Sequence, residues 1–150
     1  GRGGFTRPYS LMDLISSAAP GYMGYSRWIL GWLDDEQVSC VRTDTTVLLT
    51  PLATRGGSKL AVVTLSASSA LVVEVRRAIG YDGHLASNGA VVYLVETNNG
   101  FGGSYGDGPM EVLNGGEPLK QGDSVSHERV SFEVLVSGKD GDSIRITFAK

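Results

Sequence analysis

Residues that could carry metal or nucleophilic chemistry are few and widely spaced in this chain. The two histidines, His84 and His127, lie far apart and cannot form the His-x-x-x-His pair that places two imidazoles on one helical face for zinc. The single cysteine, Cys40, lies in the apolar run VSCV, where the expected role is a buried small side chain. Neither a G-x-S-x-G nor a G-x-x-x-x-G-K-[ST] motif occurs. The residues therefore predict no catalytic site and no zinc site within the chain.

Two glycine-rich loops contain the remaining candidates for a metal ion. GYDGHLASNG (80–89) contributes Asp82, and TNNGFGGSYGDG (97–108) contributes Asn98 and Asp107. Ca²⁺ binds several hard oxygens that converge from a tight turn, so these three side chains are candidate calcium ligands. Neither loop has the D-x-[DN]-x-[DN]-G pattern, and solvated turns are the alternative expectation.

Composition excludes several classes of partner. The net charge is -3, with 13 Lys and Arg, and no basic stripe is visible, which argues against nucleic acid as a partner. No apolar run approaches the roughly 18 residues of a membrane span. Hydrophobic residues make up 41% of the chain and charged residues 19%, which is typical of a globular protein. We expect no nucleic-acid partner and no membrane span.

The elements that would position any site are mostly strands. Eight short segments after residue 37 are rich in Val, Ile, Thr, Tyr and Phe, and Gly, Asn, Asp and Ser fill the gaps between them. SGKDGD (137–142) is typical of a hairpin turn, with Gly138 and Gly141 available for positive φ. The pattern predicts a mainly β protein, an antiparallel β-sandwich or strongly bent sheet with one N-terminal amphipathic helix. The predicted strands are 38–41, 45–50, 59–66, 70–77, 89–96, 110–113, 129–137 and 142–149.

Two of these segments are apolar almost throughout. ALVVEVRR (70–77) and GAVVYLVE (89–96) are therefore predicted to be central strands covered on both faces. Glu74 and Arg76 interrupt the first. We expect them to pair across the sheet on a solvated face, with a site carboxylate as the alternative for Glu74.

The predicted helix covers residues 22–33. Tyr25, Trp28 and Trp32, together with Ile29, recur at i, i+3, i+4 and i+7 and share one apolar face. Pro20-Gly21 precede the segment as a breaker, and Asp34-Asp35 follow it. We expect both indoles to be buried in a core.

A resemblance joins this helix to the turn before it. SLMD (10–13), with Met12 and Asp13, followed by RWILGWLDD (27–35), is similar to the methionine turn and following helix of secreted zinc metallopeptidases of the immune inhibitor A type. LVVEVRRAIGYDGHLASNGAVVYLVET (71–97) and the C-terminal strands also resemble that family. The likeness covers most of the chain from about Pro8 onward.

The resemblance implies that the catalytic residues and this chain belong to different parts of one protein. In that family an H-E-x-x-H helix upstream of the methionine turn holds the zinc and the general base, and none of those residues is present here. It implies that residues 1–35 are the tail of a catalytic domain and residues 36–150 a β-rich domain packed against it. The chain would then be secreted or cell-surface, inactive alone, and partnered by the upstream catalytic segment or a protein surface. A degenerate relative without catalysis would look the same.

A binding module is the alternative function. Tyr81, Phe101 and Tyr105 lie in glycine-rich turns, where exposed rings can stack on sugars. On this hypothesis the chain is a free-standing β-sandwich that binds carbohydrate or another surface.

Overall fold

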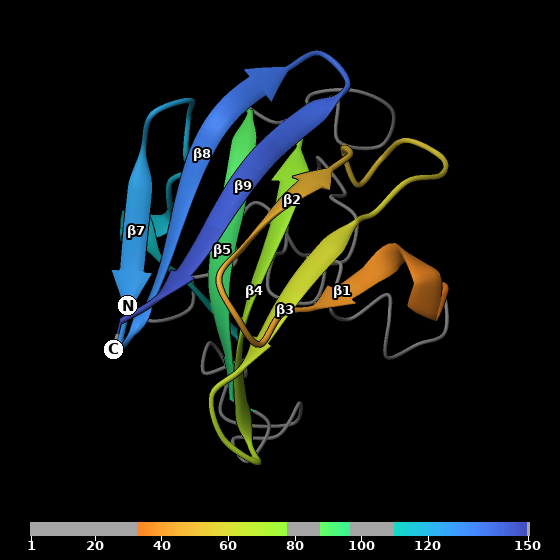
Figure 1. Ribbon diagram of the computed structural model, residues 1–150. Helices are drawn as coiled ribbons and strands as arrows, with labels where there is room; N and C mark the ends of the chain where they lie inside the picture. The colour runs from red at the N-terminus through yellow and green to blue at the C-terminus, as the bar shows by residue number, and fades with distance from the viewer. Residues whose placement is uncertain (1–32, 78–87, 97–109, 150) are drawn as a thin grey trace, which may run out of the picture.

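Nine strands form two stacked sheets, and the four-stranded sheet lies in front of the five-stranded one in Figure 1. The computed structural model describes residues 33–77, 88–96 and 110–149, and these statements concern those residues. In spatial order the five-stranded sheet contains β1 (Val38–Cys40), β3 (Leu60–Thr64), β4 (Ser69–Arg76), β5 (Gly89–Glu96) and β6 (Met110–Val112). The four-stranded sheet contains β2 (Thr45–Leu49), β9 (Gly141–Phe148), β8 (Val130–Gly138) and β7 (Ser124–His127). The prediction of a mainly β protein is confirmed, and the sheets do not close into a barrel.

Pairing between the described strands is antiparallel with one exception, apart from an isolated parallel bridge between Pro51 and Val75. β1 pairs with β3 in parallel, Val38 opposite Leu60, which corrects the expectation of a purely antiparallel fold. The exception arises because β2, which lies between them in sequence, belongs to the other sheet and pairs with β9. The chain thus crosses between the layers twice before β3.

The main core lies between the two sheets. Its buried residues come from alternate positions of strands in both layers, as expected when two sheets pack face to face. Val130, Phe132 and Val134 of β8 lie in this core as the period-two pattern predicts. Val136 was expected on the same face but is 56% exposed, because a register shift between Val134 and Val136 reverses the alternation.

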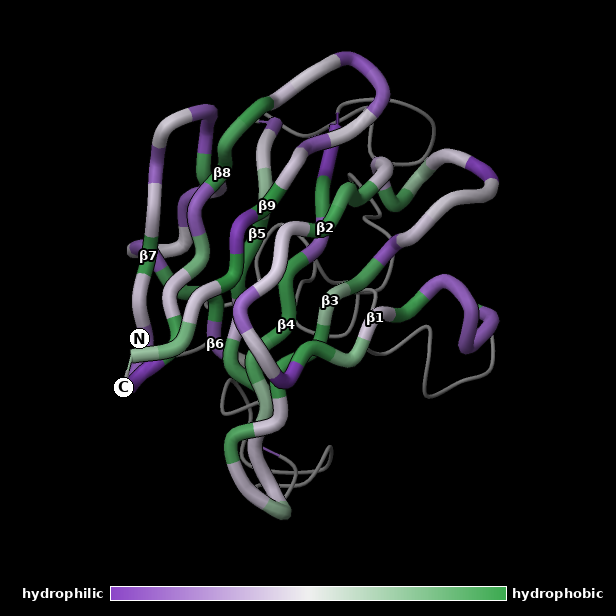
Figure 2. Tube along the Cα trace, viewed as in Figure 1, coloured by the Kyte–Doolittle hydropathy of each residue, from purple (hydrophilic) through white to green (hydrophobic). Residues whose placement is uncertain are grey.

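A second cluster of buried hydrophobic side chains lies on the outer face of the five-stranded sheet. Figure 2 shows hydrophobic residues along much of β4, in contrast to the alternation along β8. Both faces of β4 and β5 are largely buried, so the prediction that these are central strands covered on both sides is confirmed. The buried side chains of the outer cluster are Leu60, Val62, Val72, Val91, Tyr93, Val95 and Val112.

Other local predictions need correction. Cys40 is exposed rather than buried, because it ends a three-residue edge strand. β7 was not predicted, since its sequence SVSH has little apolar content and its side chains are half-buried or exposed.

The helix predicted over 22–33 lies outside the described residues except for Leu33. The described residues contain only two helical turns, both of the 3₁₀ type and three residues long: η2 (Asp35–Gln37) and η5 (Asn114–Gly116). The domain division at residue 35 stays a prediction.

Candidate functional site

A buried polar network lies within the outer apolar face of the five-stranded sheet. Glu74, Arg76 and Tyr93 are each fully buried. The Arg76 Nε donates to Glu74 Oε2 at 2.7 Å, and the Tyr93 hydroxyl donates to Glu74 Oε1 at 2.6 Å. Both carboxylate oxygens of Glu74 therefore accept charge-assisted or short hydrogen bonds, which offsets the cost of burying its charge.

The strand geometry brings these three side chains together. Glu74 and Arg76 are two residues apart on β4, so they point to the same face of the sheet. Val91 of β5 lies opposite Glu74, which makes Tyr93 its diagonal neighbour, within reach of a long aromatic side chain. The prediction of a partner across the sheet is confirmed for Glu74, since Tyr93 lies on β5. The prediction of a solvated face is wrong, because Glu74 and Arg76 are fully buried, and they also pair with each other along β4.

This network is suited to packing rather than to catalysis. A general acid or base must reach a substrate proton, and the side chain of Glu74 has no exposed surface. Its oxygens are both engaged by neighbouring side chains. What the arrangement supplies is a fixed polar position inside an apolar face, which constrains how another element can pack there.

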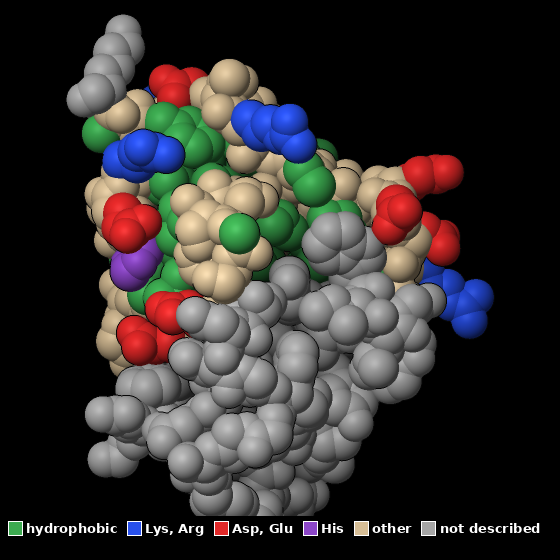
Figure 3. Space-filling view, turned by 90° about the horizontal axis from the view of Figure 1, so that it is seen from below, with side chains coloured by type: hydrophobic (Ala, Val, Ile, Leu, Met, Phe, Trp, Pro, Cys, Tyr) green, Lys and Arg blue, Asp and Glu red, His purple; other side chains and the backbone are tan. Residues whose placement is uncertain are grey.

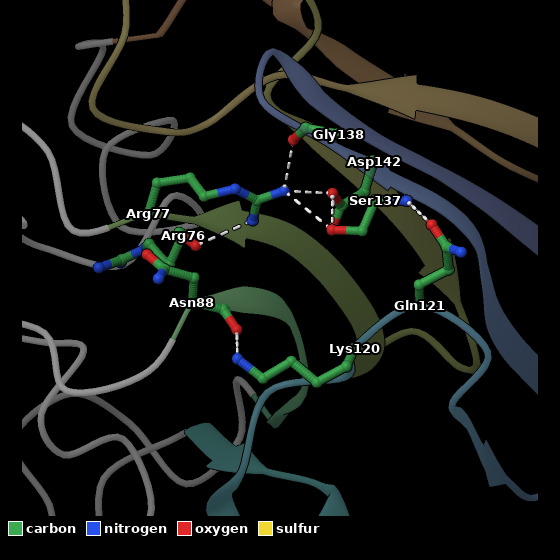
Figure 4. A network of polar contacts seen from close by, with 8 residues as sticks. All are labelled: Arg76, Arg77, Asn88, Lys120, Gln121, Ser137, Gly138 and Asp142. Atoms are coloured by element: carbon green, nitrogen blue, oxygen red, sulfur yellow. Dashed lines mark hydrogen bonds and ion pairs between the residues drawn. The ribbon is translucent and has the colours of Figure 1, made fainter.

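A second polar cluster joins the two sheets at one end. Arg77, which follows β4, points to the β8–β9 hairpin, as Figure 4 shows. Its guanidinium donates to the carbonyl of Gly138 at 3.0 Å and forms an ion pair with Asp142, whose side chain is fully buried. The Ser137 hydroxyl donates to the same Asp142 oxygen, Oδ1, at 2.8 Å, whereas Oδ2 has no hydrogen-bond partner. Arg77 thus compensates a buried charge and ties the sheets together.

Lys59 forms a third polar group near this end. The residue is only 1% exposed, and its Nζ donates to Thr50 Oγ1 at 2.8 Å, the Pro51 carbonyl at 2.8 Å and Thr54 Oγ1 at 3.0 Å. Burial lowers the pKa of Lys59, because a desolvated ammonium is disfavoured relative to the neutral amine. All three acceptors belong to the segment between β2 and β3, so the lysine holds that segment against the sheets.

Lys59, Arg77 and Asp142 were not predicted from the sequence as functional candidates. The sequence could have indicated that Lys59 is buried. Ala61 and Val63 alternate toward the core, and Lys59, two residues before Ala61, falls on the same face. Arg77 follows β4 of the five-stranded sheet, whereas its partner Asp142 lies on β9 of the four-stranded sheet. No pattern within either segment indicates a contact between the two.

A cavity of about 350 Å³ opens between β3 and the end of β9. It combines two exposed arginines with an apolar surface that includes Phe148. Figure 3, which views the molecule from below, shows hydrophobic side chains between Lys and Arg side chains on that face. The cavity is lined by Val41, Arg42, Thr64, Arg129, Phe148 and Ala149.

The residues singled out from the sequence fall largely outside the described ranges. This applies to the methionine turn, the helix stripe, the calcium candidates and the loop aromatics, namely Met12, Asp13, Tyr25, Trp28, Trp32, Asp82, Asn98, Asp107, Tyr81, Phe101 and Tyr105. Of the two histidines, His127 is described, half-buried at the end of β7. Over residues 33–77, 88–96 and 110–149 there is no group of three His, Cys, Asp or Glu side chains placed to hold a metal. Within the same ranges no helix has the length and apolar character needed to cross a membrane.

Comparison of the chain with protein-family models, curated proteins and solved structures gave no match.

Proposed function

We propose that this chain is the C-terminal, non-catalytic part of a secreted metallopeptidase-like protein and that it supports the floor of the active site. The resemblance of SLMD (10–13) and RWILGWLDD (27–35) to peptidases of the immune inhibitor A type supports the assignment. The outer face of the five-stranded sheet is the observation that carries the supporting role. On this face, buried apolar side chains surround the Glu74–Arg76–Tyr93 network. Such a composition is typical of a face that packs against another element and not of a solvated one.

The contact proposed for this face involves the aromatic stripe predicted from the sequence. Tyr25, Trp28 and Trp32 would lie on one side of a helix, and that helix would end near Leu33. Leu33 itself packs against the outer cluster. A helix that ends on this face would connect the sheet to the methionine turn, and through it to the zinc-binding segment that the family carries upstream. The chain's own part in the reaction would be to hold that segment in place.

The coding sequence provides the first test. The proposal expects a His-Glu-x-x-His segment upstream in the same reading frame, and zinc-dependent hydrolysis of a protein substrate by the whole protein. A start codon immediately before Gly1, or an unrelated upstream domain, would overturn it. Binding of the chain to insoluble polysaccharide, abolished by Tyr105→Ala, would instead favour the carbohydrate-binding alternative.

The supporting role is tested by variants in the whole protein. Tyr93→Phe removes the hydroxyl that donates to Glu74 and leaves a buried charge with one partner fewer, which costs about 2 kcal/mol of stability. We expect Tyr93→Phe and Trp28→Ala each to lower the melting temperature of the catalytic part and its hydrolytic rate. Arg145→Ala, at an exposed position on the four-stranded sheet, is the control and should change neither. Unchanged hydrolysis and melting in both test variants would show that the outer face does not support the catalytic part.

A further inference from the structure

The ammonium of Lys59 is a buried cation that forms no ion pair with another described residue. Its contacts are two threonine hydroxyls and one backbone carbonyl, all neutral oxygens. The ion pairs of the described residues do not include it. Neutral acceptors satisfy the hydrogen bonds of an ammonium but leave its charge uncompensated, and at low dielectric that charge acts over a longer distance than in water.

A cavity of about 330 Å³ lies directly beside this cation. Thr50, Pro51 and Thr54, which hold the Lys59 ammonium, also line the cavity. Its wall comes from both layers, because the segment between β2 and β3 supplies one side and the turn of the β8–β9 hairpin supplies the other. The remaining lining residues are Arg55, Gly56, Gly57, Lys139 and Asp140.

The charges around the cavity are mainly positive. Arg55 and Lys139 are exposed, and neither appears in an ion pair among the described residues. The lining contains two cations, Arg55 and Lys139, and one carboxylate, Asp140, and the Lys59 ammonium lies behind the wall formed by Thr50, Pro51 and Thr54. These four charged groups together carry a net charge of +2, in a chain whose overall net charge is -3.

We propose that this cavity binds a small molecule through a phosphate or sulfate group. Arg55 supplies a guanidinium that can bond two oxygens of such a group at once, and Lys139 supplies a mobile point charge from the opposite wall. The volume is at the lower end of the range for small-molecule sites, so it accommodates the group to which the anion is attached as well as the anion.

The local backbone is built for this geometry. Gly57 has φ +79° and a Cβ there would lie 2.7 Å from Thr50 Oγ1, the oxygen that accepts from Lys59. Only glycine allows the wall to approach this closely. The site does not depend on the proposed supporting role, since it lies at the end of the molecule rather than on the outer face of the five-stranded sheet.

The experiment is a titration of the full chain with inorganic phosphate and with sulfate at constant ionic strength. Binding is measured from the changes in the amide chemical shifts. We expect shifts over residues 50–59 and 138–141. In the Arg55→Ala/Lys139→Ala variant the affinity should fall by about tenfold for each cation removed. Arg145→Ala/Lys120→Ala is the matched control, because it removes the same charge from other exposed positions and should leave the affinity unchanged.

The two anions also identify the kind of ligand. Tighter phosphate binding indicates a phosphate ester, and tighter sulfate binding indicates a sulfate ester. Either result supports the site. Shifts no larger than those caused by chloride, or equal weakening in the test and control variants, would overturn the proposal.

Discussion

Arg77 shows how one side chain can decide the stability of the contact between two sheets. Its ion pair with Asp142 has side-chain exposures of 13% and 0%, whereas the Arg145–Glu133 pair has exposures of 54% and 45% and a separation of 4.0 Å. Losing one partner of a buried pair leaves an uncompensated charge, and exposed pairs contribute little. The two arginines therefore form a matched comparison within one protein.

We predict that Arg77→Ala lowers the free energy of unfolding by about 3 kcal/mol, because Asp142 already has one carboxylate oxygen without a partner. Arg145→Ala should change it by less than about 0.5 kcal/mol. Urea denaturation of both variants measures the difference. Equal costs would contradict the assignment of Arg77 as the residue that compensates Asp142.

Lys59 predicts a pH dependence of stability. Its pKa in the folded protein lies below the ordinary value of 10.5, so between these two pKa values the unfolded chain binds more protons than the folded one. Stability should therefore rise with pH over that interval and gain nothing more above 10.5. Lys59→Met should remove this rise, whereas Lys139→Met, at an exposed position, should retain it. The measurement is the unfolding midpoint in urea from neutral pH to pH 10.5, and identical slopes in the native protein and Lys59→Met would contradict it.

At the scale of elements, the β8–β9 hairpin depends on one of its two glycines. Gly141 has φ +154°, and a Cβ there would lie 2.4 Å from the carbonyl oxygen of Leu49 on the neighbouring strand. At Gly138 the nearest atom would be 3.6 Å away, an ordinary contact. The sequence motif SGKDGD indicates a hairpin, but it does not distinguish these two positions.

We predict that Gly141→Ala lowers the free energy of unfolding by about 2 kcal/mol or more, through both backbone strain and displacement of β2. Gly138→Ala should stay within about 0.5 kcal/mol of the native protein. Thermal denaturation of the two variants tests the prediction. A larger effect at Gly138 would mean that the hairpin is limited by its turn and not by its contact with β2.

The strands were predictable where hydrophobic pattern alone determines them. β5 has the predicted bounds, and β4 and β8 differ from theirs by one residue at each end, because long apolar runs leave little freedom. β7 has no such run, and the bulge after Val134 reverses the faces without any local marker. The parallel pairing of β1 also could not be inferred, since it follows from the position of β2 in the other layer.

The candidate sites were less predictable than the fold. Glu74 and Arg76 stand out in the sequence as charges within an apolar run, but their burial depends on what covers the sheet. The cavity beside Lys59 joins segments from two sheets, and composition within either segment does not indicate it. Contacts between the two sheets depend on how the sheets pack against each other. The hydrophobic pattern of one segment does not show which residues of the other sheet it will meet.

At the scale of the whole molecule, the shared core predicts a large cost for truncation on the inner face. Phe132 is fully buried between the sheets, so Phe132→Ala should lower the free energy of unfolding by about 3 to 5 kcal/mol. Val136→Ala, on the same strand beyond the bulge and 56% exposed, should cost well under about 1 kcal/mol. Chemical denaturation monitors both. Comparable losses would mean that Val136 is covered in solution.

The pairing of β2 with β9 also determines when the molecule can fold. Thr45 lies opposite Ile146, so a strand near the start of the described chain meets its partner only near the end. Contacts this distant in sequence carry a large loop-closure entropy and slow the search for the native state. During synthesis, β2 leaves the ribosome long before β9, and among the described strands it has no partner until residues 50–140 have followed. The four-stranded layer is therefore completed last, and an incomplete chain would expose the inner face of the other layer.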